Sequence, residues 1–432
     1  MVAESWLCLG GTELANNSRT VAYARNGAGP RGVAVYDLYP GLPALLGDAP
    51  YTTPAGDDAA WYDPAIPASA GFGGLYITNI SGMDSAPYSR PVVDRTGDGV
   101  VLGRPRYGGR SVQVTGILMG RSCCSTMYGL SWLAAALRAG CADGPACEGD
   151  SLQYLAAMPS ALDSPGTTTP WRTLQNVGLT DGVTITNKLG GASACGNCGG
   201  CPMMEIQFTL TAAPWAYWDP TTILTQAPWT SDDLPQACIT WVHSTGPCSS
   251  SGDDCPSTDP MPLYDPQCPP STAIPDLPII ADDCACLPLS RRRKVISVPA
   301  ADVPVWLDAV PVMELFSGDT SLRNVRIRFF QNPLNRTDPD DIGECAWCSE
   351  VNISYVPASS SLGFDGARQQ VVVTLPGGGV QSAAPVVSGP SGGPLSWPTM
   401  TCGTPYLVSI EAETSSVDPA AWVSLDIVTR EV

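Results

Sequence analysis

The sequence predicts a mainly β protein with at least two domains, and three observations lead to that prediction. The chain has 432 residues, more than one ordinary domain core needs. Its 44 glycines and 42 prolines break helices and favour turns, so many short strands joined by loops are expected. Several short segments alternate apolar and polar side chains, which is the period of a half-buried strand.

The first domain is expected over residues 1–230 as a β-barrel or β-sandwich. Its strongest strand signals are residues 76–80, 110–119 and 205–212, since the last of these places Ile206, Phe208 and Leu210 at alternate positions. Residues 1–60 are otherwise turn-rich, and 51–74 are expected to form a long loop. Weaker signals predict short strands at residues 21–24, 33–36, 90–94 and 183–185, with a turn at 97–99.

One amphipathic helix is expected after the strand at 110–119. Ser125 or Thr126 can cap its N-terminus, and Gly140 stands where a left-handed C-terminal cap would lie. Four apolar residues recur between them at helical spacing: Leu130, Leu133, Ala134 and Leu137. A single helix of this kind among strands is expected to cover one face of a sheet.

The second half divides into a linker and a second domain. Residues 231–294 are rich in proline and contain six cysteines, which predicts a linker or a small insertion held by disulfides. This stretch ends in the basic run 291–294, which we interpret as a solvated loop. Residues 295–432 are expected to form an antiparallel β-sandwich, with strands at 324–329, 351–355, 371–375, 406–413 and 421–428.

The overall charge and the absence of apolar runs exclude several classes of protein. The net charge is −19 and the pI about 4.3, so the surface repels phosphate backbones and nucleic-acid binding is not expected. No window of 18 consecutive apolar residues predicts a membrane span, and the start resembles no signal peptide. A protein that is made in the host cytoplasm and released by lysis, such as a virion protein, needs no signal peptide, and its thiols would oxidise late. The 17 cysteines and the start of this chain fit such a protein.

The cysteines allow three interpretations. Disulfides are the first, and the candidate residues are Cys123, Cys124, Cys141, Cys147, Cys195, Cys198, Cys201, Cys345 and Cys348. A metal or iron–sulfur site on Cys195, Cys198 and Cys201 is the second, because two intervening residues let thiolates converge on one metal. No fourth ligand is in register with these three, and free thiols are the remaining alternative.

No other pattern predicts catalysis or a cofactor. His243 is the one histidine, so sites that need two histidines are excluded. Gly-x-Ser-x-Gly at 389–393 lies among prolines and glycines, not between the strand and the helix that a nucleophile elbow requires. The aspartates that could bind calcium lack EF-hand spacing and are interpreted as solvated turns: Asp94, Asp98, Asp338, Asp340 and Asp341. We therefore expect no enzyme activity and no cofactor.

An ordered series of short motifs resembles a known family. The series contains residues 80–87 (ISGMDSAP), Arg90, 97–99 (GDG), 108–110 (GGR) and 208–212 (FTLTA), and it closes at 219–220. In this order the motifs resemble the N-terminal domain of siphophage distal tail (Dit-like) minor tail proteins. Residues 326–329, 353–358 and 362–366 are similar to a second domain of larger minor tail proteins from actinobacterial phages.

The resemblance implies a structural protein of the virion tail tip. It implies a ring, often of six copies, that joins the tail tube to the tip, with the tail tube protein, the tail hub or baseplate and other tip proteins as partners. The C-terminal domain would then point outward. An alternative is a peripheral tail protein that binds host cell-wall glycan through exposed aromatic side chains such as Trp397, Tyr406 or Trp422.

Overall fold

The computed structural model confirms a mainly β chain built from antiparallel sheets with few helices. Its description covers residues 5–30, 36–84, 86–138, 149–157, 170–189, 203–218, 222–229, 237–238, 288–289, 291–302, 307–343, 346–401, 403–413 and 416–431.

The chain forms two compact units. Unit 1 contains Met1–Pro220 and the last residues, Arg430–Val432, whereas unit 2 contains Thr221–Thr429. In sequence, unit 2 is therefore inserted between two segments of unit 1. Most of residues 231–294 lie outside the described part, so the predicted linker and the division at 230 and 294 stay predictions.

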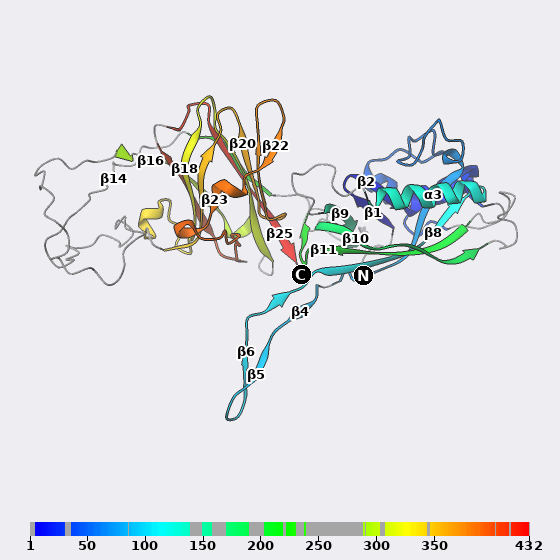
Figure 1. Ribbon diagram of the computed structural model, residues 1–432, viewed down its shortest axis with the longest axis horizontal. Coiled ribbons are helices and arrows are strands. Elements are labelled where there is room, and N and C mark those ends of the chain that lie inside the picture. Colours follow the sequence, from blue (N-terminus) through cyan, green and yellow to red (C-terminus); the bar gives the residue numbers. More distant parts are fainter. Residues whose placement is uncertain are drawn as a thin grey trace, which may run out of the picture. The chain divides into compact units, whose positions relative to one another are not determined.

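Unit 1 contains a sheet of four long antiparallel strands in the order β3-β8-β11-β10. Their bounds are β3 Phe72–Ser81, β8 Arg110–Gly120, β11 Met203–Ala212 and β10 Trp171–Leu189. The first residues of β10 also belong to a second run of strands, β2 (Thr12–Asn16), β1 (Trp6–Leu9), β9 (Asp150–Leu155), β10 and β12 (Ala216–Trp218). Figure 1 shows β8, β10 and β11 lying side by side.

The core of unit 1 follows the predicted alternation. On β11, Ile206, Phe208 and Leu210 are buried and the residues between them are half-buried. On β8, Val112 and Val114 are buried while Ser111 and Gln113 are exposed. The strands predicted at 110–119 and 205–212 are thus confirmed, and one face of the four-stranded sheet is in the core.

The predicted helix exists, but its N-terminal cap was misplaced. α3 spans Cys123–Ala136, and Ser122 caps it by accepting a hydrogen bond at Oγ from Ser125 N, 3.3 Å away. Ser125 and Thr126 already lie in the first turn, because Cys123 and Cys124 begin the helix. Gly140 lies outside the described residues.

The buried side of α3 packs on the sheet as predicted, but Leu130 and Ala134 of the predicted apolar face are only half-buried. Thr126, Gly129, Leu133 and Leu137 recur at helical spacing and are all buried. Gly129 is required there, since a Cβ at this position would lie 2.1 Å from Cε2 of Phe72 on β3. The helix and the sheet therefore approach more closely than any larger residue would allow.

Residues 21–24 are helical, so the strand predicted there was wrong. α1 spans Asn17–Tyr23, and α2 follows at Leu42–Leu46. Between them, Ala24–Ala28 form a turn that is kinked at Asn26 and Gly27, where the backbone is not helical. Asn16 caps α1 by accepting a hydrogen bond from Arg19 N at 3.0 Å. This cap and the packing of α1 beside β3 outweigh the β propensity of Val21 and Tyr23. Residues 33–35 of the other predicted strand lie outside the described part.

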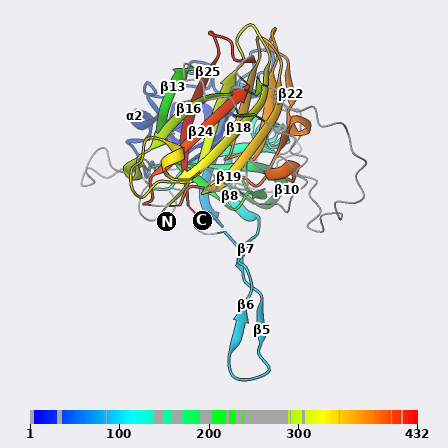
Figure 2. The same ribbon diagram turned by 90° about the vertical axis from the view of Figure 1, so that its left-hand side faces the viewer.

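Unit 2 is an antiparallel β-sandwich, as predicted. One sheet contains β16 (Arg291–Val298), β24 (Tyr406–Glu413), β18 (Leu322–Gln331), β19 (Trp347–Val356) and β23 (Val387–Ser388). The other contains β13 (Thr222–Pro228), β25 (Trp422–Glu431), β17 (Asp308–Phe316), β20 (Ser361–Asp365), β21 (Gln370–Thr374) and β22 (Val380–Ser382). Figure 2 shows the strands of the first sheet side by side, and β14 (Ala237–Cys238) pairs separately with β15 (Pro288–Leu289).

The basic run at 291–294 belongs to a strand, so its interpretation as a solvated loop was wrong. These residues begin β16 and pair with β24, where Glu411 accepts an ion pair from Arg293 at 3.2 Å. Glu411 also pairs with Arg326 of β18 at 2.9 Å, and Arg328 pairs with Glu350 of β19 at 2.7 Å. Carboxylates on neighbouring strands neutralise the arginines, which lets a basic run lie within a sheet.

Replacing Phe208 by alanine should destabilise unit 1 most clearly among single core changes. Phe208 is 1% exposed, and its removal leaves a cavity, which costs about 3–5 kcal/mol. Urea unfolding followed by tryptophan fluorescence measures the change in free energy. Ser111→Ala, at an exposed position on the neighbouring strand, is the matched control and should change it by less than about 0.5 kcal/mol.

Candidate assembly surface

One edge of the four-stranded sheet is closed by side chains of α1. Asn17 donates from Nδ2 to Ile77 O at 3.0 Å and accepts at Oδ1 from Ile77 N at 2.7 Å. Thr20 donates from Oγ1 to Leu75 O at 3.2 Å. The Asn17 amide thus takes the place of a neighbouring strand, and β3 cannot accept another strand at this point.

The opposite edge of the same sheet, along β10, is open. Residues 171–177 of β10 have strand partners on both sides, namely β9 and β12. From Gly178 to Leu189, β11 is the one strand partner within the part of the chain that the structure describes. Asn176, with a left-handed φ of 54°, marks this change. We name residues 178–189 the open edge.

The side chains of the open edge are exposed on both faces. Seven of them, Thr180, Asp181, Thr184, Ile185, Thr186, Asn187 and Lys188, are exposed. Three threonines donate from Oγ1 to backbone oxygens of β11: Thr180 to Thr209, Thr184 to Gln207 and Thr186 to Glu205, each at 3.2 Å. The sequence predicted a strand at 183–185 alone, because a strand exposed on both faces lacks the alternation that identifies a half-buried strand.

A hairpin arm projects from unit 1 between β3 and β8, as Figures 1 and 2 show. β4 (Tyr88–Ser89) pairs with β7 (Arg106–Tyr107), and β5 (Val92–Asp94) pairs with β6 (Val100–Leu102). We name residues 88–107 the arm. All of them except the half-buried Gly103 are exposed. The strand predicted at 90–94 and the turn at 97–99 are confirmed.

A buried arginine fixes the base of the arm. Arg110, the first residue of β8, is 1% exposed and donates to Met83 O, and also to Pro214 O at 3.0 Å. Burial lowers the pKa of Arg110, although the nearby charges of Tyr154, Glu431 and Asp84 oppose that effect. Gly82, with a φ of 86°, is the residue after β3; a Cβ there would lie 1.9 Å from Ser111 O. The arm therefore leaves the sheet through a rigid base.

Aromatic contacts link the arm to the last residues of the chain. The rings of Tyr88 and Tyr107 lie 5.3 Å apart, and Tyr107 lies 4.7 Å from Trp215. The Arg430 guanidinium lies over the Trp215 ring at 4.1 Å. Next to it, Glu431 accepts an ion pair from Arg172 at 3.0 Å and a hydrogen bond from Trp218 Nε1 at 2.9 Å.

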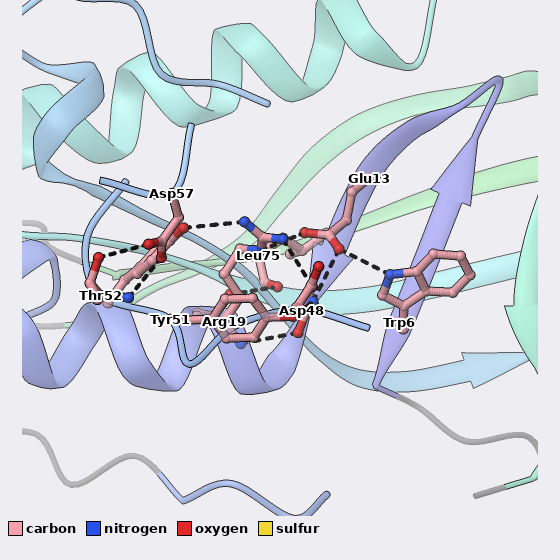
Figure 3. Close-up of polar contacts among 11 residues, drawn as sticks. Trp6, Glu13, Arg19, Asp48, Tyr51, Thr52, Asp57 and Leu75 are labelled. Carbon is pink, nitrogen blue, oxygen red and sulfur yellow. Dashed lines mark hydrogen bonds and ion pairs between the residues drawn. The ribbon is translucent and has the colours of Figure 1, made fainter. Parts of the chain in front are cut away.

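A polar cluster around Arg19 holds the loop at 48–57 against α1 (Figure 3). Arg19 pairs with Glu13 at 2.8 Å and with Asp48 at 3.4 Å, and its guanidinium lies over the Tyr51 ring at 4.4 Å. Tyr51 donates to Asp48 Oδ2 at 2.5 Å. Burial, followed by the hydrogen bond to Asp48, raises the pKa of Tyr51, so this hydroxyl stays protonated and acts as a donor. The cluster thus ties the loop at 48–57 to α1.

The structure leaves the predicted cysteine sites largely untested. Six of the nine candidates lie outside the described residues: Cys141, Cys147, Cys195, Cys198, Cys201 and Cys345. Cys123 and Cys124 are adjacent at the start of α3. Cys348 has a free thiol, donating from Sγ to Phe329 O at 3.0 Å, which does not support its predicted bridge. Cys124 is disulfide-bonded, and the other predicted bridges stay predictions.

The other candidate sites do not form centres for chemistry. Asp338 and Asp340 form ion pairs with Arg293 at 3.3 and 3.1 Å. Asp94 and Asp98 lie on the arm, far from these residues in sequence. In the described ranges, no three His, Cys, Asp or Glu side chains are close enough to hold a metal ion. Pro390–Gly392 forms one 3-10 turn, not a nucleophile elbow, and His243 lies outside these ranges. None of the described helices has the length and apolar character needed to span a membrane.

The aromatic residues proposed for glycan binding differ in exposure. Tyr406 is 1% exposed and its hydroxyl accepts a hydrogen bond from Thr401 N at 2.9 Å, so it cannot stack on a sugar. Trp397 is half-buried against Phe364, with ring centroids 4.8 Å apart. Trp422 stacks on Phe316 at 5.8 Å and lines a shallow apolar hollow with Ala227, Pro228, Pro419 and Ala420. Apart from the indole N–H of Trp422, the side chains that line the hollow have no polar group to orient a sugar.

Comparisons with known proteins give a faint likeness to phage tail proteins. No family model matches the chain, and no curated protein matches it. Among solved structures, it is similar to the Dit protein of phage SPP1, described as a hub of the adsorption apparatus in phages that infect Gram-positive bacteria. The identity is 9% and the TM-score 0.35, over 84% of this chain and 96% of that one.

A second likeness is to a chain of the phage P2 baseplate in its activated conformation with Ca, and the same baseplate with Sr matches equally. Here the identity is 11% and the TM-score 0.34, over 79% of this chain and 92% of that one. At such identities and scores, the role of the chain has to be inferred from its own surface.

Replacing Asn17 by alanine should open the closed edge and destabilise unit 1. Ile77 N and Ile77 O would lose their partner while buried, which costs about 1–3 kcal/mol in the free energy of unfolding. Chemical unfolding measures this cost. Asn26→Ala is the matched control, because Asn26 donates one exposed hydrogen bond to Thr52 O and its loss should have little effect. Equal stability of the two variants would contradict the role of Asn17.

The loop at 48–57 should loosen in acid. Burial opposes ionisation of Asp57, but hydrogen bonds from Thr52 Oγ1 and Thr52 N, both at 2.7 Å, outweigh it and lower the pKa of Asp57 below 3.8. A lowered pKa contributes stability that is fully present above 3.8 and is lost as the pH falls through the lowered value.

Hydrogen exchange of residues 48–57 in wild type and in Asp57→Asn measures this contribution. The variant should exchange faster at neutral pH, and the difference should shrink as the pH falls below 3.8 and through the lowered pKa of Asp57. Asp319→Asn, an exposed change in unit 2, is the control. A difference that persists in acid would show that Asp57 acts through its shape and not its charge.

Proposed function

We propose that this chain is a structural subunit of a phage tail tip, and that it assembles into a ring through the four-stranded sheet of unit 1. One observation carries the proposal: the sheet has one edge closed by Asn17 and another left open at 178–189. An open edge of this length presents unpaired backbone groups, which pair readily with a strand of another chain. A subunit that joins the next copy head to tail forms a ring when the rotation closes.

The motif series described above supports the tail-tip part of the proposal. Residues 80–87 include Met83, an acceptor for Arg110, and residues 108–110 end in Arg110 itself. The motifs on which the resemblance rests thus form the base of the arm and the start of β8. In such a ring, unit 1 would join the tail tube to the hub or baseplate, and unit 2 would carry the contacts to other tip proteins.

The surface of unit 1 agrees with a passive structural role. The outer face of β8 and β11 carries mostly polar side chains, among them Gln113, Thr115, Glu205, Gln207 and Thr209. The chain's charge of −19 keeps separate copies apart at low ionic strength. Assembly is therefore expected to depend on salt or divalent cations, which screen the repulsion.

A charge placed on the open edge should prevent assembly without unfolding the subunit. Ile185 is exposed, and a second lysine on the open edge, in addition to Lys188, adds charge that opposes pairing with another chain. For Ile185→Lys, the concentration needed to form rings should rise at least about tenfold, equivalent to about 1.4 kcal/mol per contact. Mass photometry across a dilution series, with negative-stain electron microscopy of the products, measures the shift.

Leu334→Lys is the matched control, because Leu334 is 71% exposed and belongs to unit 2. This variant should assemble like wild type. The proposal is wrong if wild type remains monomeric at all concentrations and salt conditions. It is also wrong if Ile185→Lys forms the same rings as wild type at the same concentration.

A further inference from the structure

The arm carries apolar side chains on both of its faces. In the register of β5 and β6, Val92 lies opposite Leu102 and Val93 lies opposite Val101. Directly opposed residues project to the same face, and successive residues project to opposite faces. The Val92–Leu102 pair therefore occupies one face of the arm, and the Val93–Val101 pair occupies the other.

Both pairs are open to solvent in the single chain. The four side chains are 48–62% exposed. An isolated two-stranded hairpin is at best marginally stable in water, and it needs a third surface to hold its shape. Apolar side chains gathered in this way on an exposed segment point to an interaction site. Because both faces are apolar, a partner that covers one face would leave the other in water.

The charge of the arm differs in sign from that of the whole chain. The arm contains four arginines, Arg90, Arg95, Arg104 and Arg106, and two aspartates, Asp94 and Asp98. It therefore has a net charge of +2, and since the chain has −19, the remainder has −21. The arm is attracted to the acidic surface of another copy, while two acidic bodies repel each other.

The base of the arm is held in a fixed position before any partner binds. Arg110 fixes the point where the arm joins β8, and Tyr107 packs on Trp215 beneath Arg430. Rigid anchoring lowers the entropy that is lost when a partner binds. A flexible loop of the same composition would lose more conformational freedom on docking.

We propose that the arm inserts between two surfaces contributed by other copies of this chain, so that each apolar face is covered by a different surface. The inference rests on the proposed self-assembly and adds to it a second contact, separate from the open edge. Valines and Leu102 supply the apolar contact, and the four arginines lie against acidic side chains at the rim. Insertion between two copies would lock neighbouring subunits together.

Face-selective substitutions test this arrangement. The first variant is Val92→Thr with Leu102→Thr, and the second is Val93→Thr with Val101→Thr. Threonine keeps the branched shape and the β propensity, so the hairpin pairing is retained. Each variant should raise the concentration for assembly at least about tenfold, because apolar area is lost from a buried contact. Leu334→Thr is the control and should assemble like wild type.

The outcomes separate the two proposals. If wild type assembles and neither arm variant differs from it, the arm inference is overturned and the ring proposal stands. If one variant alone weakens assembly, the arm lies on a single surface and insertion is overturned. If wild type never assembles, both proposals fail.

Photo-crosslinking gives a direct second reading. Benzoylphenylalanine placed at Val93 or at Leu102 of the full chain should form crosslinks between copies, and mass spectrometry should map the two positions to different peptides. Crosslinks confined to one copy would overturn the inference. The full chain could instead bind vesicles of anionic phospholipid through the arm and form no crosslinks between copies. That result would overturn the inference and identify a membrane surface as the partner of the arm.

Discussion

The architecture of unit 1 depends on how the backbone hydrogen bonds at the two edges of its four-stranded sheet are satisfied. Inside the sheet, β8 and β11 have partners on both sides, so their backbone groups need nothing else. At β3 the side chain of Asn17 meets the backbone of Ile77, which ends the sheet within the chain itself. At 178–189 nothing comparable occurs among the described residues, and the sheet ends against solvent. A sheet closed at one edge and open at the other has a direction, which the proposed head-to-tail assembly would use.

The same asymmetry explains why the helices lie where they do. α1 has to be beside β3 to present Asn17 and Thr20, and its position is fixed by the Asn16 cap and by the Arg19 cluster. α3 covers the buried face of the sheet through Gly129 and Leu133. Both helices act on the β3 and β8 side, which leaves the end of β10 exposed.

In unit 2, charge pairs take part in defining the sheet. Arg293, Glu411 and Arg326 stand on three adjacent strands, so one carboxylate holds two guanidinium groups across the sheet. Glu411 is 4% exposed, and removal of either arginine would leave its charge less compensated in a poorly solvated place. A stretch that looked basic in isolation is thus part of a neutralised network.

The sequence determined the elements whose signal is local. The strands at 110–119 and 205–212 follow from alternation alone, since one face of each is more deeply buried and the period of two is visible without any partner. The arm's turn at 97–99 and the helix after Ser122 follow from glycine and from helical spacing. The sandwich of unit 2 followed from the number and spacing of such strands. These features depend on residues that are close in sequence, so composition and order were enough.

The tertiary structure alone decided the features that join distant residues. Asn17 could not be identified as an edge cap, because its partner is Ile77, 60 positions away. Nor could the basic run at 291–294 be placed in a sheet before Glu411 was known to lie beside it. The open edge at 178–189 gave no alternating signal because both of its faces are exposed, and the link from Tyr107 through Trp215 to Arg430 spans most of the chain. The pattern of apolar and polar side chains along a segment shows which face of that segment is buried. Sheet edges, charge pairs and the anchoring of the arm depend instead on which strands are neighbours, and only folding brings those strands together.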